Sequence, residues 1–452
     1  MNRLKQIWSN LLGSFWFVPS LIVALSIALA VAVVEADYTV SRQWLARWPH
    51  VFGATAAGAR GILSTIAGSM MAVVGVTFSM TLVTLALASS QYTSRILRNF
   101  MRDRVTQVVL GIFAGIFGYC LIVLRTIRGG DEGAFIPSLA VTLGVLLAIV
   151  GIGVLIFFIH HIASSIQASS IIASVAGETM VAVDRLFPEA AGEGPLDDDE
   201  DQAPPPLQER NWQTVPGRGN GYIQSIDNAA LLRLAREHKT IVRMECGIGA
   251  FVVDDVPLAS LALETPPERE ITAALQAAYS IDRHRTLNQD CAFGIRQIVD
   301  MALRALSPGT NDTTTAVMCV DYLTAILARL APRNFPSSYR YEEGELRVIA
   351  MAPTFAGLVA ESFDQIRGSA QGNVAVMLRI LGALQTIASL TASPGRRRVL
   401  REQVEYIGEL ADHTVESAHD RARFESRLAR ARSALETEQV LSTQEQSTKV
   451  QR

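Results

Sequence analysis

Charged residues are scarce in this chain of 452 residues. Asp, Glu, Lys and Arg together make up 18% of it, and 49% of the residues are hydrophobic, whereas soluble domains contain about 25% charged residues. The shortage is greatest in the first third of the chain, where four long apolar runs occur. This composition excludes a wholly soluble protein, and so much apolar sequence also excludes an intrinsically disordered one.

Cysteine is scarce too, with four residues, at positions 120, 246, 291 and 319. Cysteines this few and this scattered in a long chain exclude a small secreted scaffold held together by disulfides. The formal net charge is −3, which argues against a protein dedicated to nucleic acid, so no nucleic-acid partner is expected.

The apolar runs are each long enough to cross a bilayer, which takes roughly 20 residues. They cover residues 15–34, 62–88, 105–124 and 137–159. No Asp, Glu, Lys or Arg lies within their cores, so a helix there satisfies its backbone in lipid without burying a charge. The sequence therefore predicts a membrane α-helical fold, in which four transmembrane helices precede a cytoplasmic, mainly helical α+β domain.

The flanking charges predict the orientation. Arg3 and Lys5 precede the first run, and the loop between the second and third runs is rich in arginine. Its basic residues are Arg95, Arg98, Arg102 and Arg104. The positive-inside rule then places the N-terminus in the cytoplasm, and an even number of spans places the C-terminus there as well. The expected location is a cytoplasmic (inner) membrane.

One face of the second span is polar. At about 100° per residue, it carries Thr77, Thr81, Thr84 and Gln91. These side chains are candidates for lining a water-filled path, with the arginine loop at its inner mouth attracting anions. The favoured alternative is that the threonine hydroxyls bond to carbonyls one turn earlier in their own helix. The roughly opposite face is made of small residues, which let a neighbouring helix approach closely.

The composition of the whole chain divides it into four parts. A transmembrane domain with an amphipathic extension is expected over 1–187, an acidic, Pro-rich flexible linker over 188–216, an α+β domain over 217–393, and a charged helix with a disordered tail over 394–452. Strands are predicted at 221–226, 240–246, 251–253 and 346–351. Helices are predicted at 229–237, 268–280, 290–306, 313–330, 354–368, 373–391 and 396–434.

Histidines are scattered, and the only adjacent pair is His160 and His161, directly after the fourth span. Neighbours on a helix point apart, so these two cannot bind one metal there. We interpret them as interfacial residues, because a pH-sensing role has no partner residue in the sequence.

Polar residues cluster around the predicted helix 290–306. They are Arg285, Gln289, Asp290, Ser307, Asn311 and Asp312. Such side chains could bind a phosphate or perform acid–base chemistry. The favoured interpretation is helix capping and turn formation, because the residues fall at the two ends of one helix. No P-loop, zinc-protease, Cys-x-x-Cys or Gly-x-Ser-x-Gly motif is present, so no catalytic residue, metal or cofactor is expected.

Three segments resemble a known family. They are FSMTLVTLALASSQYTSRILRNFMRDR (78–104), LIFFIHHIASSIQ (155–167) and RTLNQDCAFGIRQIVDMALRALSPGTNDTTTA (285–316). The chain resembles, over nearly its whole length, the bacterial predicted-membrane-protein family DUF2254. The resemblance implies four spans and a cytoplasmic domain, and it implies no activity. Thr313 stands where the family is expected to have proline.

Two functions remain open. The first is a homo-oligomeric pore or transport protein, whose cytoplasmic domain assembles or gates it. The second is a membrane-anchored sensor or scaffold, whose cytoplasmic domain binds a ligand or a protein. A polar stripe within a span favours transport slightly, whereas the lack of an intramembrane charge weighs against it. A membrane enzyme is the weakest alternative, because no catalytic set is found.

Overall fold

A computed structural model describes residues 16–39, 55–91, 103–128, 135–165, 167–187 and 210–450, and all of their side chains except those of 87–91 and 437–450. Contacts divide the chain into two compact units, unit 1 (Met1–Ser170) and unit 2 (Ile171–Arg452). The sequence placed the end of the membrane part at residue 187, whereas the contacts assign the segment from Ile171 onward to unit 2.

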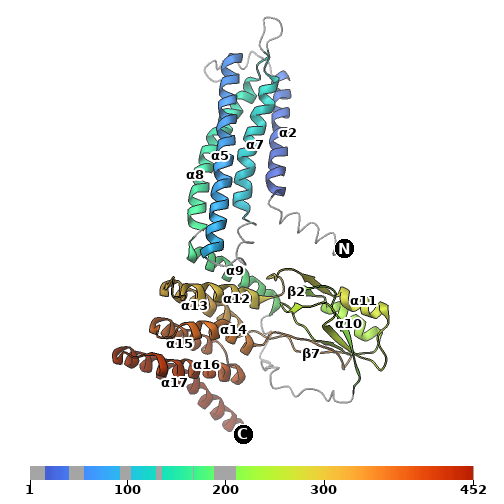
Figure 1. Ribbon diagram of the computed structural model, residues 1–452, viewed down its shortest axis with the longest axis vertical. Coiled ribbons are helices and arrows are strands. Elements are labelled where there is room, and N and C mark those ends of the chain that lie inside the picture. The colour runs from blue at the N-terminus through green and yellow to red at the C-terminus, as the bar shows by residue number, and fades with distance from the viewer. Residues whose placement is uncertain are drawn as a thin grey trace. The chain divides into compact units, whose positions relative to one another are not determined.

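Unit 1 contains long apolar helices that run side by side (Figure 1). They are α2 (Phe17–Thr39), α5 (Ala56–Gln91), α7 (Arg104–Thr126) and α8 (Ser138–Ser165). Each overlaps one of the four runs predicted to be spans. Helix α8 ends at Ser165 and α9 (Ala168–Leu186) begins three residues later, so the expected extension of the fourth span is a separate helix.

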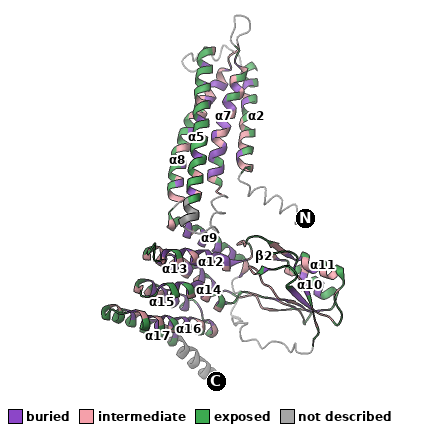
Figure 2. Ribbon diagram, viewed as in Figure 1, coloured by how far each residue is buried: buried purple, intermediate pink, exposed green. Residues whose placement is uncertain are grey.

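Helix α7 is the centre of unit 1. It packs against α2, α5 and α8. In the most apolar 18-residue stretch of α7, 56% of the residues are buried, compared with 17% in that of each of the other three helices. Figure 2 shows this concentration of buried residues on α7. A Cβ on Gly111 would lie 3.0 Å from Cα of Pro19, and one on Gly115 would lie 2.4 Å from Oγ of Ser26. The glycines of the third span therefore serve close packing within the chain.

Replacing Gly111 by alanine is expected to push α2 away from α7. The new methyl group would lie 2.8 Å from Cδ1 of Ile22 and against the backbone of Pro19, and overpacking of this kind costs about 1–3 kcal/mol. Thermal unfolding of the detergent-solubilised protein measures the loss. Gly153→Ala is the matched control, because a Cβ at Gly153 meets nothing within 4 Å; equal unfolding temperatures for the two variants would contradict the close packing.

Five helices of the described chain are long and apolar enough to cross a membrane by length and composition. Four are those of unit 1, and the fifth is α13 (Thr313–Leu330) in unit 2. Helix α13 buries one face, including Val320, Leu323 and Leu327. Its other face is charged, because Asp321 pairs with Arg379 and Arg329 pairs with Asp184.

The helices of unit 2 form a stack of pairs (Figure 1). Besides α13, they are α12 (Cys291–Ala305), α14 (Phe355–Ser369), α15 (Val374–Ala388), α16 (Pro394–Thr414) and α17 (Ala418–Val450). Helix α14 packs between α12 and α16, and α15 packs between α13 and α17. Side-chain N-caps begin most of these helices, at Asp290, Asp312, Thr354, Asn373 and Ser393. Each cap satisfies a backbone N–H that the helix itself leaves without a partner.

The α+β part of unit 2 has two sheets. Its strands are β1 (Trp212–Pro216), β2 (Gly221–Ile226), β3 (Val242–Met244), β4 (Phe251–Val252), β5 (Pro257–Ala262), β6 (Tyr279–Asp282), β7 (Tyr339–Glu342) and β8 (Glu345–Ile349), with helices α10 (Asn228–Glu237) and α11 (Arg269–Ala277). The strand orders are β1-β5-β3-β8-β7 and β4-β2-β6. All pairs are antiparallel except β3 with β8, where Val242 lies opposite Val348. Strand β8 follows α12 and α13 in sequence, so the larger sheet is completed only after both helices.

Several sequence predictions in unit 2 were wrong in detail. The helix expected over 268–280 ends at Ala277, because the next residues pair with β2 as β6. Strand β5 was missed, since Leu258 to Leu261 are all buried and a strand buried on both faces shows no alternation. Strand β1 occupies the end of the expected linker 188–216, whose residues 188–209 lie outside the described chain.

The long helix expected over 396–434 is two helices. Helix α16 ends at Thr414 and α17 begins at Ala418, and the two pack against each other. Arg421 donates a hydrogen bond of 2.8 Å to the carbonyl of Val415, which satisfies the end of α16. Helix α17 buries Phe424, Leu428 and Leu435.

An ion-pair cluster joins α9 to α13 within unit 2. Asp184 accepts hydrogen bonds of 2.5 and 2.6 Å from Arg329 and lies 2.7 Å from Nη2 of Arg333. The bonds from Arg329 hold the pKa of the Asp184 carboxyl below its ordinary value.

Acid is therefore expected to weaken this junction. Because the folded-state pKa of Asp184 is depressed, its contribution to stability is present above the unfolded-state pKa, about 3.9, and is lost as pH falls through the folded-state pKa. Asp184→Asn should lower the unfolding temperature at pH 7, and the difference from wild type should shrink progressively as the pH falls below about 4. A difference that stays constant over this pH range would contradict the assignment.

Candidate functional site

The threonines of the candidate path lie inside unit 1. Thr77 and Thr84 on α5 are 1% and 5% exposed. The Thr77 hydroxyl donates to the carbonyl of Val73, and the Thr81 hydroxyl donates to that of Thr77, both at 2.8 Å. Both hydroxyls therefore bond to carbonyls one turn earlier in their own helix, which is the alternative favoured from the sequence. Such bonds form without any water.

The basic candidates of the inner mouth are mostly outside the described chain. Residues 92–102 are not described, so Arg95, Arg98 and Arg102 are not placed, and the side chain of Gln91 is not described either. Arg104 is exposed at the first position of α7. The path and its mouth therefore stay a prediction.

His161 has a partner that the sequence did not reveal. Its Nε2 lies 2.9 Å from Oδ2 of Asp103. Asp103 also caps α7, accepting bonds from the backbone N–H groups of Val105 and Thr106. The two residues are 58 positions apart, so only the packing of α7 beside α8 brings them together. The pair fastens these two helices.

The polar residues around α12 separate into two groups at its ends, as capping predicts. At the start, Arg285 donates to both carboxylate oxygens of Asp290, at 2.8 and 3.0 Å, and Asp290 accepts from the N–H of Phe293 at 3.0 Å. Gln289 accepts from the N–H of Ile226. Gly249, with φ +83°, lies against the Arg285–Asp290 pair, where a Cβ would come within 2.6 Å of the carboxylate.

The second group forms the turn between α12 and α13. Ser307 donates to the carbonyl of Arg304, Asn311 adopts a left-handed conformation, and Asp312 accepts from the N–H of Thr315. Helix α12 has 15 residues, or about 22 Å at 1.5 Å per residue. The two groups are thus too far apart to act on one small ligand.

No group of His, Cys, Asp or Glu within the described residues is arranged to hold a metal ion. The buried Cys291 thiol is also unsuited to nucleophilic chemistry, because burial raises its pKa to about 12. A thiol with so high a pKa is protonated at neutral pH and is a poor nucleophile.

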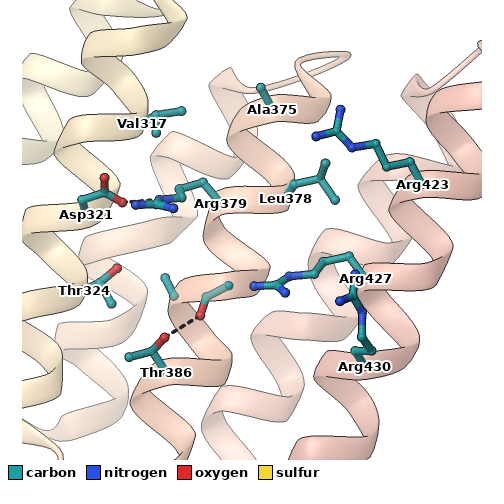
Figure 3. A pocket seen from close by; sticks show the side chains of 12 residues that line it. Val317, Asp321, Thr324, Ala375, Leu378, Arg379, Thr386, Arg423, Arg427 and Arg430 are labelled. Atoms are coloured by element: carbon teal, nitrogen blue, oxygen red, sulfur yellow. Dashed lines mark hydrogen bonds and ion pairs between the residues drawn. The ribbon is translucent and has the colours of Figure 1, made fainter.

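An open groove lined by arginines lies across α13, α15 and α17 (Figure 3). Its volume is about 690 Å³, within the usual range of roughly 300–1,000 Å³ for small-molecule sites. We call it the arginine groove. Its lining includes the charged residues Asp321, Arg379, Arg423, Arg427 and Arg430, and also Gly382. All belong to unit 2.

The charges in the arginine groove are unbalanced. Arg379 forms an ion pair with Asp321, the one acidic residue of the lining. Within the described part of the chain, no carboxylate lies in ion-pair distance of Arg423, Arg427 or Arg430. Figure 3 shows Arg427 reaching from α17 toward α15, where its guanidinium lies 2.7 Å from the position of a Cβ on Gly382.

The arginine groove was not predicted from the sequence. A signal was present, since Arg423, Arg427 and Arg430 have the 4-and-3 spacing of one helix face. The sequence predicted only one long charged helix over 396–434, with no site on it. The groove forms only because α17 packs against α15.

Comparison with known proteins agrees with the architecture. The model of a family described as "Predicted membrane protein (DUF2254)" matches residues 13–386. The chain belongs to the DUF2254 family. The match covers the helices of unit 1 and ends within α15, so the α17 wall of the arginine groove lies beyond it.

Relatives of this DUF2254 protein are uncharacterized. Uncharacterized proteins of Mycobacterium bovis and Mycobacterium tuberculosis H37Rv are each 32% identical over 446 residues, which is 96% of this chain and 83% of theirs. No solved structure matches the chain. The comparisons thus identify a membrane protein without assigning it an activity.

Proposed function

We propose that this DUF2254 protein is a membrane-anchored sensor, in which unit 1 holds the chain in the membrane and unit 2 binds an anionic solute in the arginine groove. The observation that carries the proposal is a set of three arginines in one open groove, none of which has a carboxylate partner among the described residues. Unmatched cationic groups that converge on a cleft attract and bind anions.

The contacts of unit 1 favour an anchor over a path within one copy. Its buried core is apolar, with Phe113, Tyr119 and Phe158 among the largest side chains. Two of its polar side chains, Thr77 and Asp37, are engaged in bonds to the backbone. Asp37 accepts from the N–H groups of Leu139 and Ala140 at the start of α8.

The proposal includes four spans in the inner membrane and both termini in the cytoplasm. The charged face of α13, with its pairs to Arg379 and Asp184, supports leaving that fifth helix in water, because charges within lipid are costly. Fusions of a periplasm-dependent reporter to either terminus are expected to be inactive. Activity at the C-terminus would contradict the even number of spans and the cytoplasmic unit 2.

Binding without transport is the expected result in vitro. The purified chain in detergent should bind inorganic anions saturably at low salt, and the same chain in liposomes should leave their anion flux unchanged. Binding is measured by calorimetry in detergent, and flux by release of trapped anion. Flux above that of empty liposomes would favour the pore, and saturable binding that is lost in 1 M salt would fit the electrostatic site.

A homo-oligomeric pore is the second candidate, and one observation favours it. Gly61, Gly68 and Gly75 recur every seven residues on an exposed face of α5, and a Cβ at each meets nothing within 4 Å. Small residues facing outward suit a helix from a second copy. Gly68→Leu should then convert an oligomer to monomers in detergent, and Thr77→Val with Thr81→Val should change the flux; a monomeric wild type would rule this candidate out.

A further inference from the structure

We infer that the ligand of the arginine groove carries several phosphoryl groups, as an inorganic polyphosphate chain or a multiply phosphorylated headgroup does. This inference rests on the proposed function and narrows the ligand from anions in general to one chemical class. Four features of the groove support it: the number of its charges, their type, their spacing and the character of its walls.

The number of charges points to a multivalent anion. Arg379 is neutralised by Asp321, which leaves Arg423, Arg427 and Arg430 with like charges on successive turns of α17. Like charges at this spacing repel one another. A ligand with one negative charge would relieve a third of this excess, whereas a ligand with three or more would neutralise it.

The type of charge points to phosphoryl groups. All four cationic residues of the groove are arginines. The planar guanidinium donates two parallel hydrogen bonds that match the oxygens of a phosphate, which a lysine ammonium does not do. Arg430 uses its Nε for a bond of 3.3 Å to the carbonyl of Ser426, so its two Nη groups remain for a ligand.

The spacing along α17 favours an extended ligand. Arg423 and Arg430 are seven residues apart, or about 10.5 Å along the helix axis at 1.5 Å per residue. A single phosphate is too small to contact both ends of this row. A chain of phosphoryl groups, or a ring that bears several, can contact all three guanidinium groups at once.

The walls carry no aromatic side chain. The opposite side of the groove is formed by small and aliphatic residues such as Val317, Ala375 and Leu378. Nucleobases are recognised largely by stacking on aromatic rings, so these walls do not favour a nucleotide. The ligand is recognised by its charge and its length.

Gly382 provides a test that leaves every charge in place. A Cβ at this position would lie 2.7 Å from Nη2 of Arg427, so Gly382→Leu pushes the guanidinium out of its place and fills the floor of the groove. Arg427→Lys keeps the positive charge and removes the pair of parallel N–H donors of the guanidinium. Arg398→Ala is the matched control, because Arg398 is exposed on α16 and does not line the groove.

The experiment measures binding of tripolyphosphate, inositol trisphosphate and inorganic phosphate to the full chain in detergent by calorimetry at low salt. Thermal unfolding checks that each variant is folded. We expect tripolyphosphate or inositol trisphosphate to bind at least about tenfold more tightly than phosphate. Arg427→Ala should weaken that binding about tenfold to a hundredfold, Gly382→Leu and Arg427→Lys should weaken it too, and Arg398→Ala should change it less than about twofold.

The outcomes distinguish a failure of the inferred ligand class from a failure of the proposed anion-binding function. Tighter binding of tripolyphosphate indicates a free polyphosphate chain, and tighter binding of inositol trisphosphate indicates a headgroup; either supports the inference. If phosphate binds as tightly as both, the ligand class is wrong while the anion-binding function stands. If no anion binds to the folded chain, or if Arg398→Ala weakens binding as much as Arg427→Ala, the function proposed for the groove fails as well.

Discussion

Replacing Asp290 by alanine is expected to destabilise unit 2 by about 2–4 kcal/mol. Asp290 is 5% exposed, caps α12 through the N–H of Phe293, and accepts two hydrogen bonds from Arg285. Loss of a cap costs about 1 kcal/mol, and hydrogen bonds to charged groups contribute about 1.5–3 kcal/mol. The variant also leaves the guanidinium of Arg285 without its carboxylate in a partly buried place.

The measurement is denaturant or thermal unfolding of the full chain in detergent, followed by a signal from unit 2. Asp312→Ala is the comparison, because Asp312 caps α13 in the same way without an arginine partner, and it should cost only about 1 kcal/mol. If Asp290→Ala unfolds like wild type yet abolishes a ligand-binding activity, the cluster at the start of α12 is a functional site and the capping interpretation is wrong.

Replacing Gly294 by alanine is expected to disrupt the contact between α9 and α12, with a cost of about 3 kcal/mol, at the upper end of the usual range for overpacking. A Cβ on Gly294 would lie 2.0 Å from Oγ1 of Thr179. Thr179 is fully buried on α9, and its hydroxyl is held by a bond of 2.6 Å to the carbonyl of Val175. Because Thr179 is held in this way, relief of the clash requires the two helices to separate.

A double-mutant cycle tests the cause. Thr179→Ala removes the clashing oxygen and should restore part of the stability of Gly294→Ala, so the two changes should be strongly non-additive. Gly177→Ala is the control, because Gly177 lies on α9 like Thr179 but a Cβ there meets nothing within 4 Å. This variant should be as stable as wild type or slightly more stable. Additive costs for Gly294→Ala and Thr179→Ala would show that the two residues do not touch.

Local signals were sufficient for most of the helices. The predicted helix 313–330 matches α13 residue for residue, and the predicted strand 221–226 matches β2. Helix α12 is bounded by a cap, Asp290, and by the Ser307–Pro308–Gly309 turn, both of which are visible in the sequence. These elements were predictable because the residues that begin and end them lie within them or directly beside them.

Elements defined by distant partners were less predictable. Tyr279 and Ser280 look like the end of a helix in the sequence, and they belong to β6 because β2, more than 50 residues earlier, pairs with this segment. Cross-strand pairing can override local preference in this way. The same reason explains His161, whose partner Asp103 lies on another part of the chain.

The candidate sites differ in the same respect. The six polar residues around α12 were found from sequence because they are concentrated within residues 285–312, and two of them, Asp290 and Asp312, cap helices. The arginine groove was not found, because its lining comes from three helices. Dozens of residues separate the lining residues of one helix from those of the next. One helix face with three arginines does not by itself indicate a groove.

The sequence alone indicated a membrane protein, with long apolar helices in its first part and a larger, more polar part after them, since hydrophobicity and helix length are properties of contiguous residues. Tertiary structure decided which faces of those helices are buried, that the last charged segment folds back as two helices, and that three arginines come to face α15. These outcomes depend on contacts between residues far apart in the chain, and a local pattern does not specify its distant partners.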